Sequence, residues 1–280
     1  FGHAERPGAY HAACRPRADQ QAARSRLLPN CRHDCRNRPP DGGWLRQMAK
    51  RTVDILASLL GLLALSPLLA VVLFLIWRQD GHSPFYIAER AGRGGKPFRM
   101  VKIRSMIVRA DATGVESTSA SDNRITPIGH FVRKWKLDEL SQLWNVLKGD
   151  MSLVGPRPNT LREVADYTPA EQRLLSVKPG ITDISSIVFS DEGEILRDQA
   201  DPDKAYGELI RPWKSRLGLV YVEQGGTLLD LHLIWLTLVA IVKKERALDG
   251  VQSILTRFNV DAALVETARR AAPLKAAPLP

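Results

Sequence analysis

The chain has 280 residues and is 44% hydrophobic and 25% charged, which allows one large or two small domains with a buried core. Its 40 Lys and Arg exceed its 30 Asp and Glu. The formal net charge of +10 favours an anionic partner such as nucleic acid, a phospholipid surface or a phosphorylated substrate. All three cysteines precede Met48, so disulfide bonds are excluded from the rest of the chain.

Residues 1–47 differ in composition from the rest of the chain. They contain nine Arg against four acidic residues, which is half of the net positive charge, and they show no apolar periodicity. We expect a disordered extension here, and Met48 fits a natural start, which would make residues 1–47 the product of a misplaced start codon. The extension lacks the apolar h-region of a secretory signal peptide. Cys31, His33 and Cys35 lack a fourth ligand at usable spacing and do not predict a metal site.

The longest apolar run covers residues 53–77 and is interrupted only by Asp54, Ser58, Gly61, Ser66 and Pro67. One straight helix of this length measures about 37 Å, enough to cross a hydrocarbon core of about 30 Å. Pro67 removes a backbone donor and clashes with the carbonyl group of Leu63, while Ser66 can bond to its own backbone and ease a bend. The segment by itself therefore predicts a kinked helix that crosses the membrane.

Basic residues flank this run on both sides, with Lys50 and Arg51 before it and Arg78 after it. Cytoplasmic flanks of membrane segments carry an excess of Lys and Arg. The flanks therefore fit a segment whose two ends both face the cytosol.

Residues 83–106 are rich in Gly, Pro, Lys and Arg. The pieces PFYIAER and PFRMVKIR predict two short strands around a turn at Gly92, Gly94 and Gly95, which together form a small β-hairpin. The basic residues of this hairpin form either a solvated face or a phosphate-facing one: Arg90, Arg93, Lys96, Arg99, Lys102 and Arg104. Residues 111–124, rich in Asp, Ser and Thr, predict a polar loop.

Two helices are predicted in the middle of the chain. Apolar residues at helical spacing over residues 131–149 indicate an amphipathic helix that Gly149 ends: Phe131, Trp135, Leu140, Leu143, Trp144 and Leu147. Gly155-Pro156-Arg157-Pro158 predicts a stiff, extended connection. The second helix is predicted over residues 161–177 and stops at Pro179-Gly180.

The C-terminal part contains one apolar helix over residues 227–244, interrupted only by Asp230 and His232. Its length is marginal for a membrane span, so we expect a helix that is buried or lies in the membrane interface. The tail from about residue 262 is expected to be disordered.

The adjacent carboxylates of Asp138 and Glu139 point about 100° apart on a helix, so they cannot address one atom as a symmetric pair. Arg133 precedes them on the same predicted helix, and Arg157 is held between two prolines. A carboxylate can hold Mg²⁺ or attack phosphorus, and Arg binds phosphate oxygens bidentately, so this set suits phosphoryl chemistry. Taken by itself, an Asp-Glu pair on an amphipathic helix is more often a solvated face.

The stretch LDELSQLWNVLKGDMSLVGPRP, residues 137–158, strongly resembles the central motif of the bacterial sugar transferases, the monotopic polyprenyl-phosphate phosphoglycosyl transferases. The resemblance covers about residues 50–242, in order and with compatible spacing. The other motifs that carry it are KRTVDILASLLGLLALSPLL, ERAGRGGKPFRMVKIRSM, RITPIGHFVRKWKLDEL, VKPGIT, and PWKSRLGLVYVEQ followed by LDL.

This resemblance implies an enzyme that moves a phospho-sugar from a UDP-sugar to polyprenyl phosphate and releases UMP, the first lipid-linked step of surface polysaccharide or glycoconjugate synthesis. It implies Mg²⁺ as cofactor, and a location at the bacterial inner membrane with the catalytic domain on the cytosolic face. Asp138 matches the nucleophile that forms a covalent phospho-sugar intermediate beside the metal. Glu139 matches the neighbouring catalytic carboxylate.

Four basic residues are expected to bind the phosphate groups or the substrate. Arg133 and Arg157 match the active-site arginines of the family. Lys102 and Arg104 stand on the hairpin motif that the resemblance includes. A weakly nucleophilic carboxylate needs such neutralisation of the diphosphate before it can attack.

The resemblance also reverses the expected topology, because family members use a Ser-Pro pair at the place of Ser66 and Pro67 to break a re-entrant helix. The expected fold is α+β and mostly helical: a monotopic membrane protein with an N-terminal re-entrant helix broken at Ser66-Pro67, amphipathic interface helices and a small β-hairpin. The expected parts are the extension 1–47, the re-entrant helix 48–80, a cytosolic catalytic domain 81–245, and a C-terminal helix and tail 246–280.

The chain departs from the family pattern in two places. Ser141 stands where members commonly have Pro, and a helix runs through Ser more easily. After VKPGIT, many members continue with Gly and aromatic residues, whereas this chain has Asp183-Ile184-Ser185-Ser186. We expect the second departure to bear on the choice of sugar or nucleotide.

Two other classes of function compete with the transferase. One is a non-catalytic membrane assembly partner of a glycan pathway, which the intact Asp138, Glu139, Arg133 and Arg157 argue against. The other is a nucleic-acid-binding protein, which is disfavoured because much of the positive charge lies in residues 1–47 and the rest carries a lipid-length apolar segment. The expected partners are therefore a UDP-sugar, polyprenyl phosphate and membrane lipids, with no nucleic acid.

Overall fold

The computed structural model describes residues 42–115 and 117–280, and Leu45–Pro280 form one compact unit. Cys31, His33, Cys35 and most of the expected extension lie outside the described residues. The α-helices are α2 Gly42–Asp80, α3 Pro127–Lys134, α4 Leu143–Lys148, α5 Leu161–Ala165, α6 Ile184–Val188, α7 Glu192–Ile195, α8 Pro202–Ala205, α9 Arg211–Gln224, α10 Thr227–Val242, α11 Lys244–Arg257 and α12 Ala262–Arg269. The prediction of a mostly helical α+β chain is confirmed.

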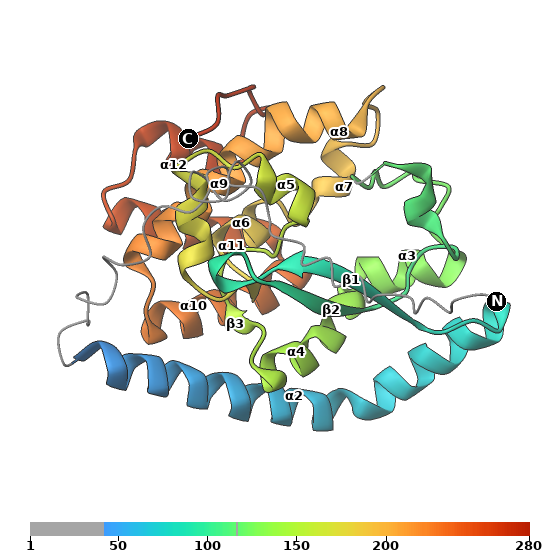
Figure 1. Ribbon diagram of the computed structural model, residues 1–280. Helices are drawn as coiled ribbons and strands as arrows, with labels where there is room; N and C mark the ends of the chain where they lie inside the picture. Colours follow the sequence, from blue (N-terminus) through green and yellow to red (C-terminus); the bar gives the residue numbers. More distant parts are fainter. Residues whose placement is uncertain (1–41, 116) are drawn as a thin grey trace, which may run out of the picture. The chain divides into compact units, whose positions relative to one another are not determined.

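Short elements connect these helices (Figure 1). The strands are β1 Phe85–Ala91, β2 Pro97–Ile103, β3 Ser152–Val154 and β4 Gly180–Thr182. The 3₁₀-helices are η2 Arg93–Gly95, η3 Ala110–Thr113, η4 Leu137–Gln142 and η5 Glu171–Ser176, and η6 Tyr206–Ile210 is a π-helix.

The predicted hairpin is present. Strands β1 and β2 pair antiparallel with Glu89 opposite Arg99. Gly94 and Gly95 in the turn have φ values of 70° and 72°, a left-handed conformation that glycine adopts without steric cost. The turn residues therefore fold the hairpin as the sequence indicated.

Strands β3 and β4 form a second, parallel pair with Ser152 opposite Gly180. Next to this pair, the two backbone segments approach each other closely. A Cβ atom on Gly155 would lie 2.4 Å from the carbonyl oxygen of Lys178. A Cβ on Gly180 would lie 2.1 Å from the Gly155 nitrogen. This packing explains why both the Gly-Pro-Arg-Pro connection and the VKPGIT motif contain glycine.

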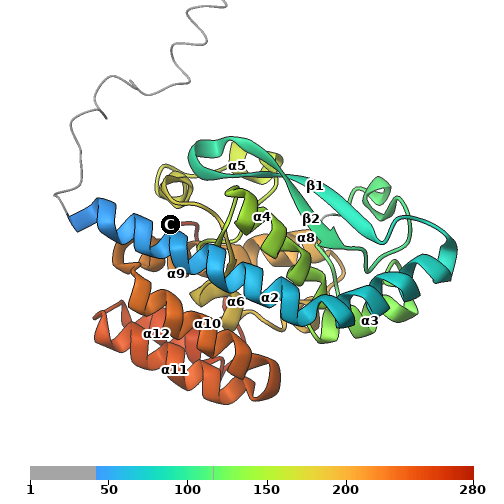
Figure 2. The same ribbon diagram turned by 90° about the horizontal axis from the view of Figure 1, so that it is seen from below.

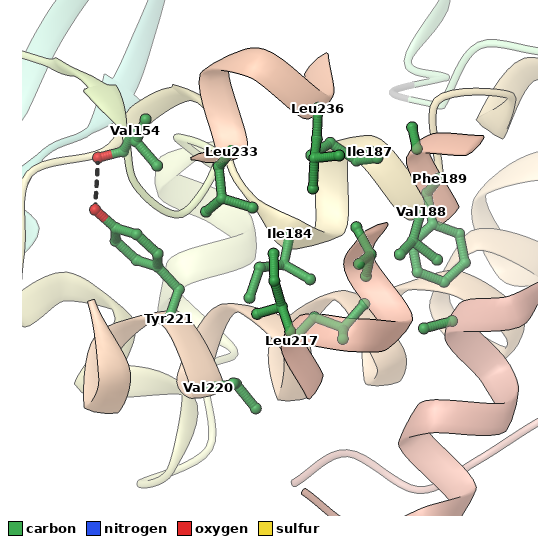
Figure 3. Close-up of a cluster of buried hydrophobic side chains, with 14 of the residues drawn as sticks. Val154, Ile184, Ile187, Val188, Phe189, Leu217, Val220, Tyr221, Leu233 and Leu236 are labelled. Carbon is green, nitrogen blue, oxygen red and sulfur yellow. Dashed lines mark hydrogen bonds between the residues drawn. The ribbon is translucent and has the colours of Figure 1, made fainter. Parts of the chain in front are cut away.

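The main hydrophobic core lies where α6, α9 and α10 meet (Figure 3). Ile184 of α6, Leu217 of α9 and Leu233 of α10 are fully buried there. At the edge of this core, the Tyr221 hydroxyl group lies 3.0 Å from the Val154 carbonyl oxygen and shares its one proton between this oxygen and Asp230 Oδ1, 2.7 Å away (Figure 3). The core thus supports the end of β3, from which the Pro-Arg-Pro connection begins.

Helix α2 is the long apolar helix expected at this position, but it is continuous through Pro67. It has 39 residues, begins before Met48, and is bent rather than broken (Figure 1). Ser66 Oγ donates to the Leu63 carbonyl oxygen at 2.8 Å, and this carbonyl is the one that the proline ring deprives of its usual donor. The side-chain bond satisfies this carbonyl oxygen, and the helix continues through Ser66-Pro67.

One face of α2 packs against the rest of the unit on both sides of Pro67. Before the proline, Asp54 Oδ1 accepts from the Leu153 backbone nitrogen at 3.0 Å. After it, Val72 and Ile76 are buried in a second cluster with Ile103 of β2 and with Val132 and Leu137: this cluster joins α2, β2, α3 and η4. Figure 2 shows the helix lying along the unit from the region of α9 and α10 to α3.

Two predicted helices are interrupted. Residues 131–149 divide into α3, η4 and α4, because Trp135 ends α3 and Lys136 takes a left-handed conformation with φ 54°. Phe131, Trp135 and Trp144 are exposed instead of forming a buried stripe. Residues 161–177 divide into α5 and η5, and Pro169 between them disfavours a helical conformation at the residue before it.

The tail from about residue 262, expected to be disordered, begins with helix α12. Helix α12 buries Leu264 and Ala268, which share one face at the spacing of a helical turn. After α12, the chain returns across α9, where Trp213 Nε1 donates to the Lys275 carbonyl oxygen at 3.0 Å. The Ala- and Pro-rich composition concealed this packing.

Candidate active site

Asp138 and Glu139 lie on the 3₁₀-helix η4 and not on a regular α-helix. The left-handed Lys136 precedes this turn, and its carbonyl oxygen accepts a hydrogen bond of 3.3 Å from the Glu139 nitrogen. A non-glycine residue in this conformation is uncommon and persists where its surroundings restrain it. The local backbone of the two carboxylates is therefore set by contacts of Lys136.

Helix α3 leads into this turn and has clear start signals. Thr126 caps it by accepting from the Gly129 nitrogen at 3.0 Å, and Pro127 occupies its first turn. A Cβ atom on Gly129 would lie 1.9 Å from the Ser105 carbonyl oxygen, so only glycine lets α3 approach the end of β2 this closely. The RITPIG sequence thus places Arg133 beside the hairpin.

The two carboxylates have different cationic partners. Lys102 Nζ, from β2, lies 3.3 Å from Asp138 Oδ2, and Arg157 Nη1, from the Pro-Arg-Pro connection, lies 2.7 Å from Glu139 Oε1. The hairpin, η4 and the loop after β3 therefore meet at one site. The hairpin pairs one cation with Asp138, and the loop after β3 pairs another with Glu139.

Burial and charge act against each other in this cluster. Burial favours a raised pKa for Glu139, but the positive charges of Arg157, Lys102 and other neighbours outweigh it and hold this pKa at about 2. The charge of Glu139 in turn raises the pKa of Arg157. Burial lowers the pKa of Lys102, and the charge of Asp138 opposes that shift. The site thus holds Glu139 as a carboxylate at neutral pH.

Arg133 completes the cluster of cations. Its Nε donates to Ser105 Oγ at 2.9 Å. Burial lowers the pKa of Arg133, while the charges of Asp138 and Asp122 act in the opposite direction. The hydrogen bond to a neutral hydroxyl leaves the guanidinium charge available to an anion.

Arg104, expected to bind phosphate, is paired with a carboxylate of α2 in this structure. Its Nη1 and Nη2 donate to the Asp80 carboxylate at 2.5 and 2.7 Å, and its Nε donates to the Ser83 carbonyl oxygen at 2.8 Å. This bidentate pair occupies the guanidinium fork and joins the end of α2 to the hairpin. The sequence pattern could not distinguish Arg104 from Lys102, because both belong to the predicted basic strand PFRMVKIR.

Ser141, the first departure from the family pattern, contributes a contact that proline could not make. Its Oγ donates to the Val101 carbonyl oxygen at 3.0 Å. Asn145 on α4 adds two bonds to the same strand, accepting from the Val101 nitrogen at 2.9 Å and donating to the Arg99 carbonyl oxygen at 2.8 Å. These bonds fasten η4 and α4 to β2. Sequence reasoning missed Asn145, although a polar residue on the buried face of a helix was a usable signal.

The second departure lies in the interior of the protein. Asp183 is 1% exposed and caps α6, with Oδ1 accepting from the Ser186 nitrogen at 2.7 Å. Ser185 Oγ donates to the same carboxylate at 2.8 Å. Burial raises the pKa of Asp183, and these hydrogen bonds oppose the shift. The Asp-Ile-Ser-Ser sequence therefore begins a buried helix.

Residues 189–192 contact residues of the site, and no sequence pattern predicted these contacts. Lys136 Nζ donates to the Ser190 carbonyl oxygen at 3.1 Å. Glu192 forms a short ion pair with Lys214 of α9, and its negative charge also acts on Arg157. Partners so distant in sequence leave no local pattern.

The donor set fits a divalent cation shared with a substrate. Among residues 42–115 and 117–280, no group of three or more His, Cys, Asp and Glu side chains converges as a protein cage. Mg²⁺ commonly uses one or two carboxylates and completes its shell with water and substrate phosphates. The hard carboxylate oxygens of Asp138, beside cations that attract phosphate, match that kind of site.

Comparisons with known proteins identify the family. The sequence model described as bacterial sugar transferase matches residues 45–244, which is most of the chain. The chain belongs to the bacterial sugar transferase family. The resemblance seen in the sequence is thus confirmed, and the basic hairpin, the Asp-Glu turn and the Pro-Arg-Pro connection all lie within the matched part.

Three curated relatives illustrate the range of the family. The galactosyl transferase CpsE of Streptococcus agalactiae is 36% identical over 206 residues, 70% of this chain and 42% of the relative. The undecaprenyl-phosphate galactose phosphotransferase of Salmonella typhimurium is 40% identical over 148 residues, 48% of this chain and 31% of the relative. The exopolysaccharide production protein ExoY of Sinorhizobium fredii is 35% identical over 167 residues, 53% of this chain and 74% of the relative. This transferase thus spans less than half of the length of the first two.

Proposed function

We propose that this transferase moves a phospho-sugar from a UDP-sugar to polyprenyl phosphate, and so begins the assembly of a surface polysaccharide or glycoconjugate. The observation that carries the proposal is the convergence of Asp138 and Glu139 with Lys102, Arg133 and Arg157 from three separate segments. The names of the Salmonella and Sinorhizobium relatives support an undecaprenyl-phosphate acceptor and a role in exopolysaccharide production.

In the first step, an Asp138 carboxylate oxygen attacks the phosphorus atom bonded to the sugar. The bond from this phosphorus to the bridging oxygen of the diphosphate breaks, and UMP leaves with the bond electrons. The phospho-sugar remains on Asp138 as an acyl phosphate. A carboxylate is a weak nucleophile, so the site must reduce the charge of the diphosphate before attack. Lys102 and Arg133 supply positive charge beside Asp138.

In the second step, an oxygen of polyprenyl phosphate attacks the same phosphorus atom. The Asp138 carboxylate leaves, and the product is a polyprenyl diphosphate sugar. Two successive displacements allow a water-soluble donor and a lipid acceptor to use one site in turn, so ping-pong kinetics are expected. Glu139 holds Arg157 in place through the 2.7 Å ion pair, and the remaining N–H groups of Arg157 can bind phosphate oxygens.

We propose Mg²⁺ as the cofactor, held by Asp138 together with phosphate oxygens of the donor. When bound, the ion polarises the phosphoryl group and offsets the charge of the departing UMP. The Asp138 carboxylate would supply the protein ligand of this ion, and the neighbouring Lys102 and Arg157 would bind the donor phosphates and not the metal.

We also propose that the protein is monotopic, on the cytosolic face of the inner membrane, with α2 re-entrant. Asp54 before Pro67 and Val72 and Ile76 after it are buried against the same unit. A span of about 30 Å needs about 20 consecutive residues in the lipid, whereas contacts with the unit recur along α2 on both sides of Pro67. Both ends of the helix then lie on the side of the catalytic domain.

The apolar surface of α2 supports its contact with lipid. Of the described residues, only Trp44–Asp80 form a helix long and apolar enough to cross a membrane, and just 11% of its most apolar window is buried. Helix α10 exposes a further set of large apolar side chains: Leu228, Leu231, Trp235, Leu238, Ile241 and Val242. We propose that α10 lies in the membrane interface, where Trp side chains are favoured.

The topology is tested by reporter tags placed before Lys50 and after Arg78. Both tags are expected to report the cytoplasm, and a periplasmic N-terminal tag would overturn the proposal. Replacing Ser66 and Pro67 together by Ala should straighten the helix and shift the segment toward spanning.

The activity is tested by UMP release from a panel of UDP-sugars with undecaprenyl phosphate and Mg²⁺ in detergent micelles. Asp138→Asn should abolish transfer with the fold retained, and Asp249→Asn, at an exposed position on α11, is the matched control. Mass spectrometry after incubation with the donor alone should find a phospho-sugar on the peptide that contains Asp138. Near-normal turnover by Asp138→Asn would exclude Asp138 as the nucleophile.

A further inference from the structure

Residues 245–280 lie beyond the part of the chain that matches the family, yet they are packed into the unit. Helix α11 buries Val251 and Leu255 in the main core, and α12 buries Leu264. The chain after α12 is bonded to α9, where Arg216 Nη2 donates to the Pro278 carbonyl oxygen at 2.9 Å. This C-terminal segment is therefore positioned to act on neighbouring parts of the transferase.

Arg270, at the end of this segment's helix α12, contacts Asp191. Arg270 Nη2, at the end of α12, lies 3.3 Å from Asp191 Oδ2, and Lys244 Nζ lies 2.5 Å from the same oxygen. The Arg270 guanidinium group also lies over the Phe189 ring, 5.6 Å from its centroid. Phe189 is 3% exposed. The C-terminal segment thus holds residues 189–191 through both charge and packing.

The same short segment also contacts the residue that precedes the catalytic turn. The Ser190 carbonyl oxygen accepts the 3.1 Å hydrogen bond from Lys136 Nζ, and Glu192 pairs with Lys214. Lys136 is the left-handed residue that precedes η4, and its carbonyl oxygen accepts from the Glu139 nitrogen. Consecutive contacts therefore connect Arg270 to the Asp-Glu turn through Asp191, Ser190 and Lys136.

We propose that Arg270 is a positioning residue for the transfer reaction. By holding Asp191, it fixes the Ser190 carbonyl oxygen, which restrains Lys136 in its left-handed conformation and thereby fixes the turn that carries Asp138. This inference rests on the proposed function, in which Asp138 is the reacting group. A displacement of reacting groups by about 1 Å can reduce a rate by about a hundredfold, so even a partial loss of this restraint should be measurable.

The test uses full-length protein and the UDP-sugar with the highest turnover in the panel above. Arg270→Met should lower kcat about tenfold, with KM for the donor changed by less than about twofold. Arg269→Met is the matched control, because Arg269 is exposed and pairs only with Glu266 among the described residues. Its kcat should equal that of the unchanged protein.

A conservative variant separates positioning from general stability. Arg270→Lys should keep kcat within about threefold of the unchanged protein, because the contact with Asp191 uses one carboxylate oxygen and does not need a bidentate fork. If Arg270→Met loses its cooperative thermal transition, Asp191→Asn takes its place, since it removes the charge with little change in size. A normal kcat of folded Arg270→Met overturns the inference. If Arg270→Met is unfolded, a normal kcat of Asp191→Asn overturns it.

The connection through Lys136 is tested by a double variant. Lys136→Met and Arg270→Met act on one series of contacts, so their effects on kcat should be clearly less than multiplicative when combined. Fully multiplicative effects overturn the inference. The unchanged protein and Asp138→Asn are measured in parallel. If the unchanged protein releases no UMP from any UDP-sugar, the proposed function fails, whereas an active unchanged protein and an inactive Asp138→Asn beside a normal Arg270→Met variant refute the positioning role alone.

Discussion

Replacing Lys50 by Met tests how α2 is fixed to the catalytic unit. Lys50 Nζ donates to Asp230 Oδ2 at 2.7 Å, to the Val154 carbonyl oxygen at 3.0 Å and to Tyr221 Oη at 3.1 Å. Asp230 is 4% exposed. Without the ammonium group, its carboxylate keeps the 2.7 Å hydrogen bond from the Tyr221 hydroxyl group but loses its only ion-pair partner among the described residues.

The expected loss of stability follows from this geometry. Removing one partner of a buried ion pair costs about 3–5 kcal/mol. The Lys50 side chain is 30% exposed and the Tyr221 bond remains, so the lower end, about 3 kcal/mol, applies. For a chain of this size, each kcal/mol shifts the Tm by about 2–4 °C, which gives a decrease of about 6–12 °C for Lys50→Met.

Thermal unfolding of the detergent-solubilised protein, followed by circular dichroism, measures this decrease. Arg78→Met is the control, because Arg78 is exposed at the other end of α2, and its Tm should change by no more than about 2 °C. The double variant Lys50→Met/Asp230→Leu should be more stable than Lys50→Met alone, since it removes the unpaired buried charge. A Tm for Lys50→Met equal to that of the Arg78 control would refute the reasoning.

Four further outcomes are expected. Arg157→Lys should lower kcat/KM for the donor by at least about tenfold despite the retained charge, because a lysine cannot make bidentate contacts; unchanged kinetics in the UMP-release assay would argue against direct phosphate binding. Arg104→Lys should lower the Tm while leaving KM for the donor unchanged, because the residue pairs with Asp80. A raised KM would indicate that Arg104 binds the donor. Gly155→Ala should impair both Tm and turnover, because the new Cβ would lie 2.4 Å from a backbone carbonyl oxygen; normal values for both would contradict the packing. Burial acts to raise the pKa of Glu171, but its hydrogen bonds, the one from Arg211 foremost, lower this pKa below its usual 4.5. The Glu171 carboxylate therefore contributes stability above pH 4.5, and this contribution is lost as the pH falls further. Glu171→Gln should therefore show a shallower fall in Tm over the acidic range, and an identical pH profile would refute the assignment.

Some elements could be predicted because their signals are local. The glycine turn between β1 and β2 and the apolar run of α10 specify a conformation within a few residues, and both are present. The motifs around Asp138 and Arg157 likewise identified the family from the order of residues alone. Ser66 and Pro67 predicted a kinked or broken helix; α2 is bent (Figure 1) but does not break at these residues.

Other features depend on contacts between distant segments, which explains the errors. The apolar spacing of residues 131–149 is that of one amphipathic helix, but the left-handed Lys136, bonded to the Ser190 carbonyl oxygen, divides it. Arg104 and Lys102 are alike in a basic strand, and they differ only because Asp80 at the end of α2 lies within reach of Arg104.

The order and chemistry of the residues are enough to establish the family, the hairpin and the expected reaction, because turn glycines, proline positions and an Asp-Glu pair between arginines are short-range patterns. Which cation meets which carboxylate is decided by the tertiary structure alone. Lys102 reaches Asp138, Arg157 reaches Glu139, and Arg270 reaches Asp191 because folding brings together segments that share no periodicity. An ion pair requires two groups within a few ångströms in space, and for residues far apart in the sequence only the fold brings them that close.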